Sequence, residues 1–218
     1  MTEAEWLAGD DPRPMLRFVE GKASNRKLRL FACAGCRRVW KSLYLKPVRQ
    51  AVEAAEQFAD GGITAVELHY ALEQAFKSYT QACQRNFHKL SSDLGYAIKS
   101  YKMMLAASMA VPAPLQVILT DAPPPDEGIF RTMFDPVLLR DVVGNPFRPA
   151  RFDRRSRSSD VTGLAAGIYE GRAFDRLPVL ADALMDAGCD DEAMLAHCRS
   201  DDPHVRGCWV VDLVLGKE

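Results

Sequence analysis

The chain has no long hydrophobic run and no marked excess of either charge. No apolar stretch approaches the ~18–20 residues that a membrane-spanning helix needs. The acidic start, 1–6, also lacks the basic and apolar regions of a signal peptide. We therefore expect a cytoplasmic protein without membrane contact, whose six cysteines are reduced. The formal net charge is −1, so overall charge identifies no partner.

Motifs that mark the large enzyme classes are missing. The sequence has no glycine-rich phosphate loop, nucleophile elbow, HExxH zinc motif or dinucleotide fingerprint. Their absence favours a non-enzymatic protein, although helical folds can assemble active sites from scattered residues. Arg85 and His88 lie close together on a predicted helix and leave a helical hydrolase or nuclease as the weakest alternative.

Strand-like alternation is nearly absent too. Leu115–Leu119 is the one convincing extended run, whereas apolar residues recur every three or four positions through most of the chain, as on helix faces. Thr2 and Thr64 are each followed three residues later by Glu, which is a capping-box pattern at a helix start. Pro47 and Pro178 fit first helical turns. The sequence predicts an all-α protein.

A proline-rich connector at 112–128 divides the chain. We expect a bundle-like helical region over 1–111, with a smaller helical region over 129–218 packed against it. Residues 1–50 hold eleven Lys and Arg against five Asp and Glu, and residues 175–218 hold four against ten. The two ends should therefore attract one another, or each should attract a separate partner.

Potential metal ligands gather near both ends of the chain. Cys33 and Cys36 are predicted to share one face of a helix, three residues apart. His204 and Cys208 would share a face of a last helix that begins at Pro203. Three thiolates and one imidazole are a common tetrahedral zinc set, so these four residues predict a zinc site that joins the two ends. The alternate ligands are His197 and Cys198.

Two other interpretations of the cysteines remain open. Free cysteine is among the most fully buried residue types, so the thiols can be ordinary core side chains. A redox CxxC normally follows a strand and opens a helix, because the helix N-terminus lowers the pKa of the first thiol. Cys33 and Cys36 lie inside a predicted helical run, which makes the redox interpretation the weaker of the two.

Five arginines fall within the ten residues 148–157, a segment without an apolar period. Arginine binds phosphate with two parallel hydrogen bonds. Phe147 and Phe152 lie among the arginines. Bases of single-stranded nucleic acid stack on such aromatic rings. The segment therefore predicts a nucleic-acid-binding arm, against the alternative that it pairs with the acidic C-terminal part or stays solvated. The arginines are Arg148, Arg151, Arg154, Arg155 and Arg157.

Three stretches of the sequence carry a family resemblance. They are 1–40, MTEAEWLAGDDPRPMLRFVEGKASNRKLRLFACAGCRRVW, then 144–149, GNPFRP, and 173–218, AFDRLPVLADALMDAGCDDEAMLAHCRSDDPHVRGCWVVDLVLGKE. Together they resemble an uncharacterised protein family that is abundant in planctomycete bacteria. The resemblance covers both ends of the chain, implies a bacterial cytoplasmic setting and brings no activity with it.

The function that the sequence favours is a non-enzymatic interaction or regulatory module that binds a protein partner. The sequence predicts a structural zinc ion as one source of stability for this module, and no other cofactor is expected. A nucleic-acid-binding accessory protein that uses the arginine arm is the main alternative.

Overall fold

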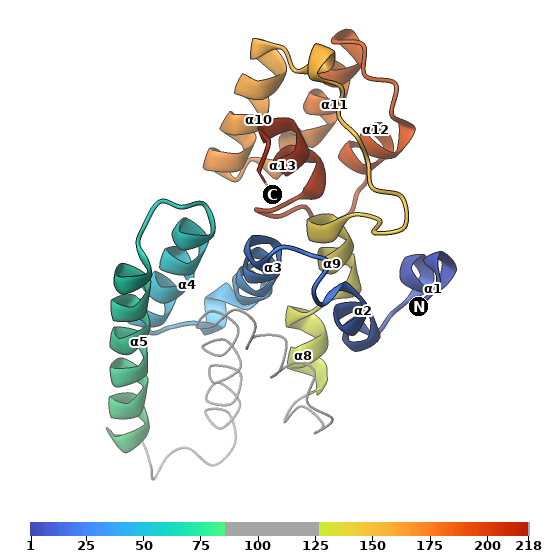
Figure 1. The fold of residues 1–218 in the computed structure, drawn as a ribbon. Coiled ribbons are helices and arrows are strands. Elements are labelled where there is room, and N and C mark those ends of the chain that lie inside the picture. The colour runs from blue at the N-terminus through green and yellow to red at the C-terminus, as the bar shows by residue number, and fades with distance from the viewer. Residues whose placement is uncertain (86–126, 218) are drawn as a thin grey trace. The chain divides into compact units, whose positions relative to one another are not determined.

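The computed structural model describes residues 1–85 and 127–217, and all regular structure in these ranges is helical (Figure 1). The prediction of an all-α protein is confirmed. The chain divides into a central unit, Asp10–Asp135, and a terminal unit, which combines Met1–Gly9 with Pro136–Glu218. None of the described helices is long and apolar enough to cross a lipid bilayer.

The predicted boundaries can be compared with these units only in part. The strand-like run Leu115–Leu119 and all but the last two positions of the connector 112–128 lie outside the described residues. The division into 1–111 and 129–218 therefore stays a prediction. One feature was not anticipated: the first nine residues of the chain belong with the C-terminal helices and not with the helices that follow them in sequence.

Local signals explain where the helices of the central unit begin. The Asp11 side chain accepts a hydrogen bond from the first turn of α2, and Ser24 does the same for α3. Thr64 and Glu67 form the predicted capping box at the start of α5. The helices are α2 (Pro12–Val19), α3 (Asn25–Arg38), η1 (Trp40–Ser42), α4 (Lys46–Ala59), α5 (Ala65–Arg85) and α8 (Glu127–Met133).

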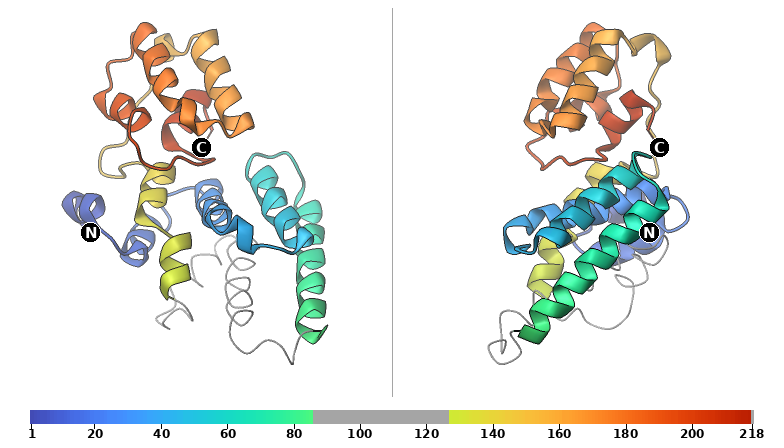
Figure 2. Two further views of the ribbon diagram at one scale, coloured as in Figure 1. Left: turned by 180° about the vertical axis from the view of Figure 1, so that it is seen from behind. Right: turned by 90° about the vertical axis from the view of Figure 1, so that its left-hand side faces the viewer.

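The centre of helix α3 is buried in the central unit. Every residue from Leu28 to Cys36 is buried. Gly35 allows α8 to approach, because a Cβ atom there would lie 2.6 Å from the carbonyl oxygen of Met133. Arg37 donates two hydrogen bonds to Glu56 on α4, at 3.1 and 2.7 Å, and α4 pairs in turn with α5 in an antiparallel hairpin (Figure 2).

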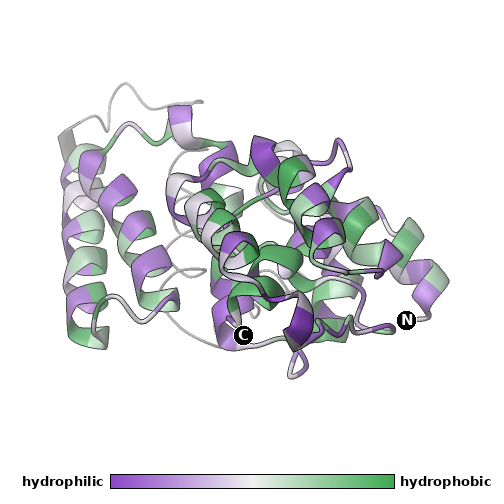
Figure 3. Cartoon of the chain, turned by 90° about the horizontal axis from the view of Figure 1, so that it is seen from above, coloured by the Kyte–Doolittle hydropathy of each residue, from purple (hydrophilic) through white to green (hydrophobic). Residues whose placement is uncertain are grey.

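The terminal unit has its own hydrophobic core. Apolar residues of α10, α11, α12 and α13 fill it, and hydrophobic and hydrophilic positions alternate around these helices as amphipathic packing requires (Figure 3). The helices are α1 (Glu3–Ala8), α9 (Pro136–Val143), η2 (Arg154–Ser156), α10 (Ser159–Gly171), η3 (Phe174–Arg176), α11 (Leu177–Asp186), α12 (Glu192–Cys198) and α13 (Trp209–Leu215).

The prediction that the last helix begins at Pro203 is wrong, because α13 begins at Trp209. Gly207 has a φ angle of +97°, which a right-handed helix does not contain. The backbone N–H of Val205 donates a hydrogen bond to the Asp141 carboxylate at 2.9 Å, a contact between residues far apart in the sequence. His204 and Cys208 therefore lie on a non-helical segment, and tertiary contacts place them.

Candidate metal centre

Four side chains from separate segments of the terminal unit converge on one point. Asp141 lies on α9, and His197 lies on the last turn of α12. His204 belongs to the segment between α12 and α13, and Cys208 immediately precedes α13. One potential ligand atom of each lies within 4.8 Å of the corresponding atoms of the other three.

The donor atoms contact one another directly, at hydrogen-bond distances. The Oδ1 atom of Asp141 lies 2.7 Å from Nδ1 of His204 and 3.1 Å from Nε2 of His197. The same Nε2 atom of His197 lies 3.3 Å from Sγ of Cys208. Tetrahedral zinc bonds of about 2.0–2.3 Å separate neighbouring donors by roughly 3.3–3.6 Å. Small outward shifts of the side chains would therefore create the coordination sphere.

The four groups are almost entirely removed from solvent. The side chains of Asp141, His204 and His197 are 2%, 6% and 17% exposed, and Cys208 is fully buried. Burying polar and charged groups is costly unless they are paired. The Asp141 carboxylate is paired with the rings of His197 and His204, and a bound cation would add positive charge beside it.

Burial and neighbouring groups together lower the pKa of Asp141 and raise the pKa of Cys208. Burial alone raises the pKa of the Asp141 carboxyl, but hydrogen bonds and positive charge from His197 and His204 outweigh it and leave that pKa below its usual value. Burial raises the pKa of the Cys208 thiol well above its ordinary value, and the Asp141 carboxylate raises it further. Without a cation the sulfur keeps its proton, and a metal ion would displace that proton on binding.

A second layer of contacts orients the donors. The other ring nitrogen of His204, Nε2, lies 3.4 Å from the Ser200 hydroxyl oxygen. The other carboxylate oxygen of Asp141 accepts the hydrogen bond from the Val205 N–H. The ring of His197 lies 5.1 Å from that of Trp209. Metal-binding histidines and carboxylates usually have such partners on their second heteroatom, because these partners hold the ligands in orientation.

The structure brings together only part of the ligand set predicted from the sequence. His204 and Cys208 belong to the cluster, and so does the alternate ligand His197. The other alternate, Cys198, is buried but is not among the four. Asp141 was missed, and the signal that could have found it is a carboxylate within the apolar helix sequence PVLLRDVV.

Cys33 and Cys36 lie in the central unit, within α3. The Cys33 thiol is 3.9 Å from the carbonyl oxygen of Val52, and both sulfurs are buried. Burial raises the pKa of Cys36 to about 12 and that of Cys33 well above its usual value, opposite to an activated redox thiol. Their coordination of one ion together with His204 and Cys208 stays a prediction.

The arginine arm is partly engaged within the terminal unit. Arg148 forms an ion pair with Glu3 at 2.8 Å, while most of its side chain stays exposed. Arg157 donates a hydrogen bond to the carbonyl oxygen of Leu213 near the end of α13. Arg151 and Arg155 are also exposed, and the backbone N–H of Arg155 donates a hydrogen bond to the Asp153 carboxylate at 2.9 Å.

Three further predicted positions cannot be placed in this site. The structure does not describe the side chains of Arg154 and Arg85, and His88 lies outside the described residues. The hydrolase or nuclease interpretation, which depends on the last two, stays a prediction.

No protein-family model, no curated protein and no solved structure matches this chain.

Proposed function

We propose that this protein is a helical interaction module whose terminal unit is stabilised by one structural zinc ion. The observation that carries the proposal is the convergence of a carboxylate oxygen, two imidazole nitrogens and a sulfur within 4.8 Å. Zinc accepts all three donor types in tetrahedral coordination. Magnesium and calcium prefer oxygen ligands throughout, so this donor set favours zinc over both.

The arrangement suits a structural role better than a catalytic one. Catalytic zinc keeps a coordination position open for water or substrate, whereas four protein ligands close the sphere. Asp141 lies within α9, His197 lies in the last turn of α12, and Cys208 directly precedes α13. One ion would thus cross-link three segments, and the free energy of metal binding would add to the stability of the terminal unit.

Metal content of purified, chelator-washed protein tests the proposal. We expect about one zinc per chain by elemental mass spectrometry, and we expect Cys208→Ser and His204→Ala to lose it. Cys198→Ser is the matched control, because Cys198 is buried in the same core but lies outside the cluster. Wild-type protein that holds no zinc, even after incubation with excess zinc chloride, contradicts the proposal.

The same measurement separates the two ligand sets. Cys36→Ser should keep its zinc if Asp141, His197, His204 and Cys208 form the site. Loss of zinc from Cys36→Ser, with zinc retained in Asp141→Asn, would instead favour the set predicted from the sequence, Cys33, Cys36, His204 and Cys208.

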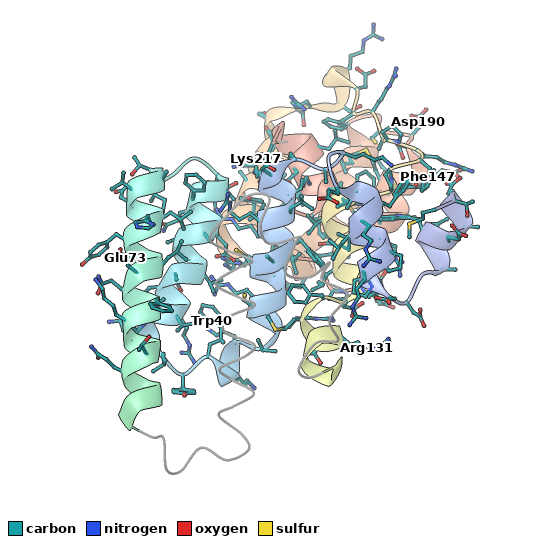
Figure 4. The ribbon with its side chains drawn as sticks, turned by 60° about the horizontal axis from the view of Figure 1, so that its bottom comes forward. Trp40, Glu73, Arg131, Phe147, Asp190 and Lys217 are labelled. Atoms are coloured by element: carbon teal, nitrogen blue, oxygen red, sulfur yellow. The ribbon has the colours of Figure 1, made fainter. Side chains whose placement is uncertain are left out.

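A protein partner is supported by the surface of α5 in the central unit. Val66, Tyr70 and Phe76 are 78%, 64% and 55% exposed. Glu73, which lies between them in sequence, points away from α4 (Figure 4). Large exposed apolar side chains on one helix are a feature of interaction sites. We expect a Tyr70→Ser/Phe76→Ser variant to keep its helical content, as measured by circular dichroism, but to lose binding of the protein partner. Equal partner binding by the variant and the wild type would exclude this surface.

Nucleic acid remains the alternative partner, supported by the exposed side chains of Arg151 and Arg155. These two guanidinium groups are available for phosphate, whereas Arg148 and Arg157 have partners within the chain.

A further inference from the structure

Helix α1 is bound to the helix that carries the metal ligand Asp141. The side chain of Trp6, on α1, is fully buried. Arg140, the neighbour of Asp141 on α9, donates hydrogen bonds to the carbonyl oxygens of Trp6 at 2.9 Å and Gly9 at 3.1 Å. The Arg140 side chain therefore satisfies carbonyl groups at the end of α1, which a helix C-terminus leaves without partners.

A second contact holds the start of α1. The Oε1 atom of Glu3 accepts a hydrogen bond from the Asn145 amide at 2.8 Å and forms the ion pair with Arg148 at 2.8 Å. Asn145 is the second residue after the end of α9, next to Gly144. Helix α1 is thus attached both to α9 and to the turn that ends it.

The turn after α9 is also in contact with the other side of the metal centre. Gly144 has a φ angle of +76°, and a Cβ atom there would lie 3.1 Å from the ring of Trp209. Trp209 in turn packs against the ring of His197. The position of α9 therefore determines where the Asp141 carboxylate lies. It also affects where the His197 ring lies, because the turn after α9 contacts Trp209.

We propose that α1 is a latch whose docking is thermodynamically coupled to zinc occupancy of the Asp141–His197–His204–Cys208 centre. The inference rests on the proposed zinc site. Docked α1 holds α9 where Asp141 can coordinate, and a zinc-bound Asp141 holds the surface on which α1 docks. Coupling of this kind is reciprocal, so the factor by which docking tightens zinc binding equals the factor by which zinc tightens docking.

Trp6 and Glu3 act as positioning residues in this arrangement, since neither belongs to the ligand set. Changes in the residues that orient metal ligands typically weaken metal affinity by about 10–100-fold. We expect Trp6→Ala, which removes the buried anchor of α1, to weaken zinc affinity by about tenfold or more. Glu3→Ala should weaken it by a smaller factor, because the Trp6 anchor remains.

Competition titration of the full chain with zinc chloride and a chromophoric chelator measures these affinities. Leu7→Ala is the matched control, because Leu7 lies next to Trp6 on α1 but is largely exposed. It should bind zinc as the wild type does. Wild-type affinity in both Trp6→Ala and Glu3→Ala would overturn the latch and leave the zinc site standing.

Hydrogen exchange of the wild-type chain tests the reciprocal effect without a substitution. Zinc should slow amide exchange in α1 by a larger factor than in α10, which carries no ligand and serves as the reference within the same unit. Equal slowing in α1 and α10 would show general stabilisation and overturn the latch. A wild-type chain that binds no zinc in the titration would overturn the latch together with the proposed function.

Discussion

The carboxylate of Asp141 and the imidazole of His204 lie 2.7 Å apart, although 63 positions separate them in the chain. The same carboxylate accepts the N–H of Val205, so one buried side chain organises both a ring and the adjacent backbone. This double contact fixes the segment before α13 against α9. It also places His204 beside His197 and Cys208.

The stability of the metal-free terminal unit should depend on pH through Asp141. Its pKa is lower in the folded state than in the unfolded chain, so the carboxylate stabilises the fold fully above the ordinary carboxyl pKa of about 4. That contribution is lost as the pH falls through the lowered folded-state pKa. Urea denaturation of chelator-treated protein between neutral and acidic pH measures the loss.

Asp141→Asn is the variant that isolates this contribution. Removing one partner of a buried, hydrogen-bonded charge cluster costs about 3–5 kcal/mol, so we expect a large loss of stability near neutral pH. The acid-dependent part of the wild-type profile should shrink in the variant. An unchanged slope of stability against pH would assign the acid sensitivity to other carboxylates.

Cysteine reactivity should follow burial. Cys33, Cys36, Cys198 and Cys208 are buried, whereas Cys189 is partly exposed. Burial raises the pKa of Cys198 to about 12, so little thiolate exists there at neutral pH. Brief alkylation of the native protein, followed by peptide mass spectrometry, should label Cys189 ahead of these four. Early labelling of Cys208 would contradict a closed metal centre.

Gly144→Ala should destabilise the terminal unit by about 1–3 kcal/mol. The substitution puts a side chain on a residue with a positive φ angle, and its Cβ atom would lie 3.1 Å from the Trp209 ring. Gly163→Ala is the matched control, because Gly163 lies within α10 and its Cβ atom would meet nothing within 4 Å. That change should stabilise the helix by about 0.5–1 kcal/mol. Thermal unfolding of both variants measures the difference, and equal effects would contradict the close contact with Trp209.

Any binding of nucleic acid through the arm should depend on Arg151 and Arg155. We expect Arg151→Ala/Arg155→Ala to weaken binding to a single-stranded oligonucleotide and to reduce its salt dependence, because two phosphate contacts are lost. Fluorescence anisotropy at several salt concentrations measures both quantities. Arg148→Ala should have a smaller effect, since Arg148 is paired with Glu3. Equal affinity of the wild type and the double variant would remove the nucleic-acid alternative.

Part of the candidate site could be predicted from the sequence. His204, Cys208 and His197 were identified because cysteine and histidine are uncommon and their clustering is visible in one short segment. Asp141 was not, because its one signal, a carboxylate within the apolar sequence PVLLRDVV, does not distinguish a metal ligand among 29 acidic residues until its burial and its neighbours are known. Its partners are also far from it in the chain.

The sequence by itself determined the helical class and the helix starts at Thr2, Pro47, Thr64 and Pro178. The capping boxes at Thr2 and Thr64 formed as predicted, because each needs hydrogen bonds only between residues three apart. Tertiary structure alone decided that Met1–Gly9 joins the C-terminal helices and that Asp141 meets His197, His204 and Cys208. Those contacts depend on how separate helices pack, and packing is set by the whole core and not by neighbouring residues.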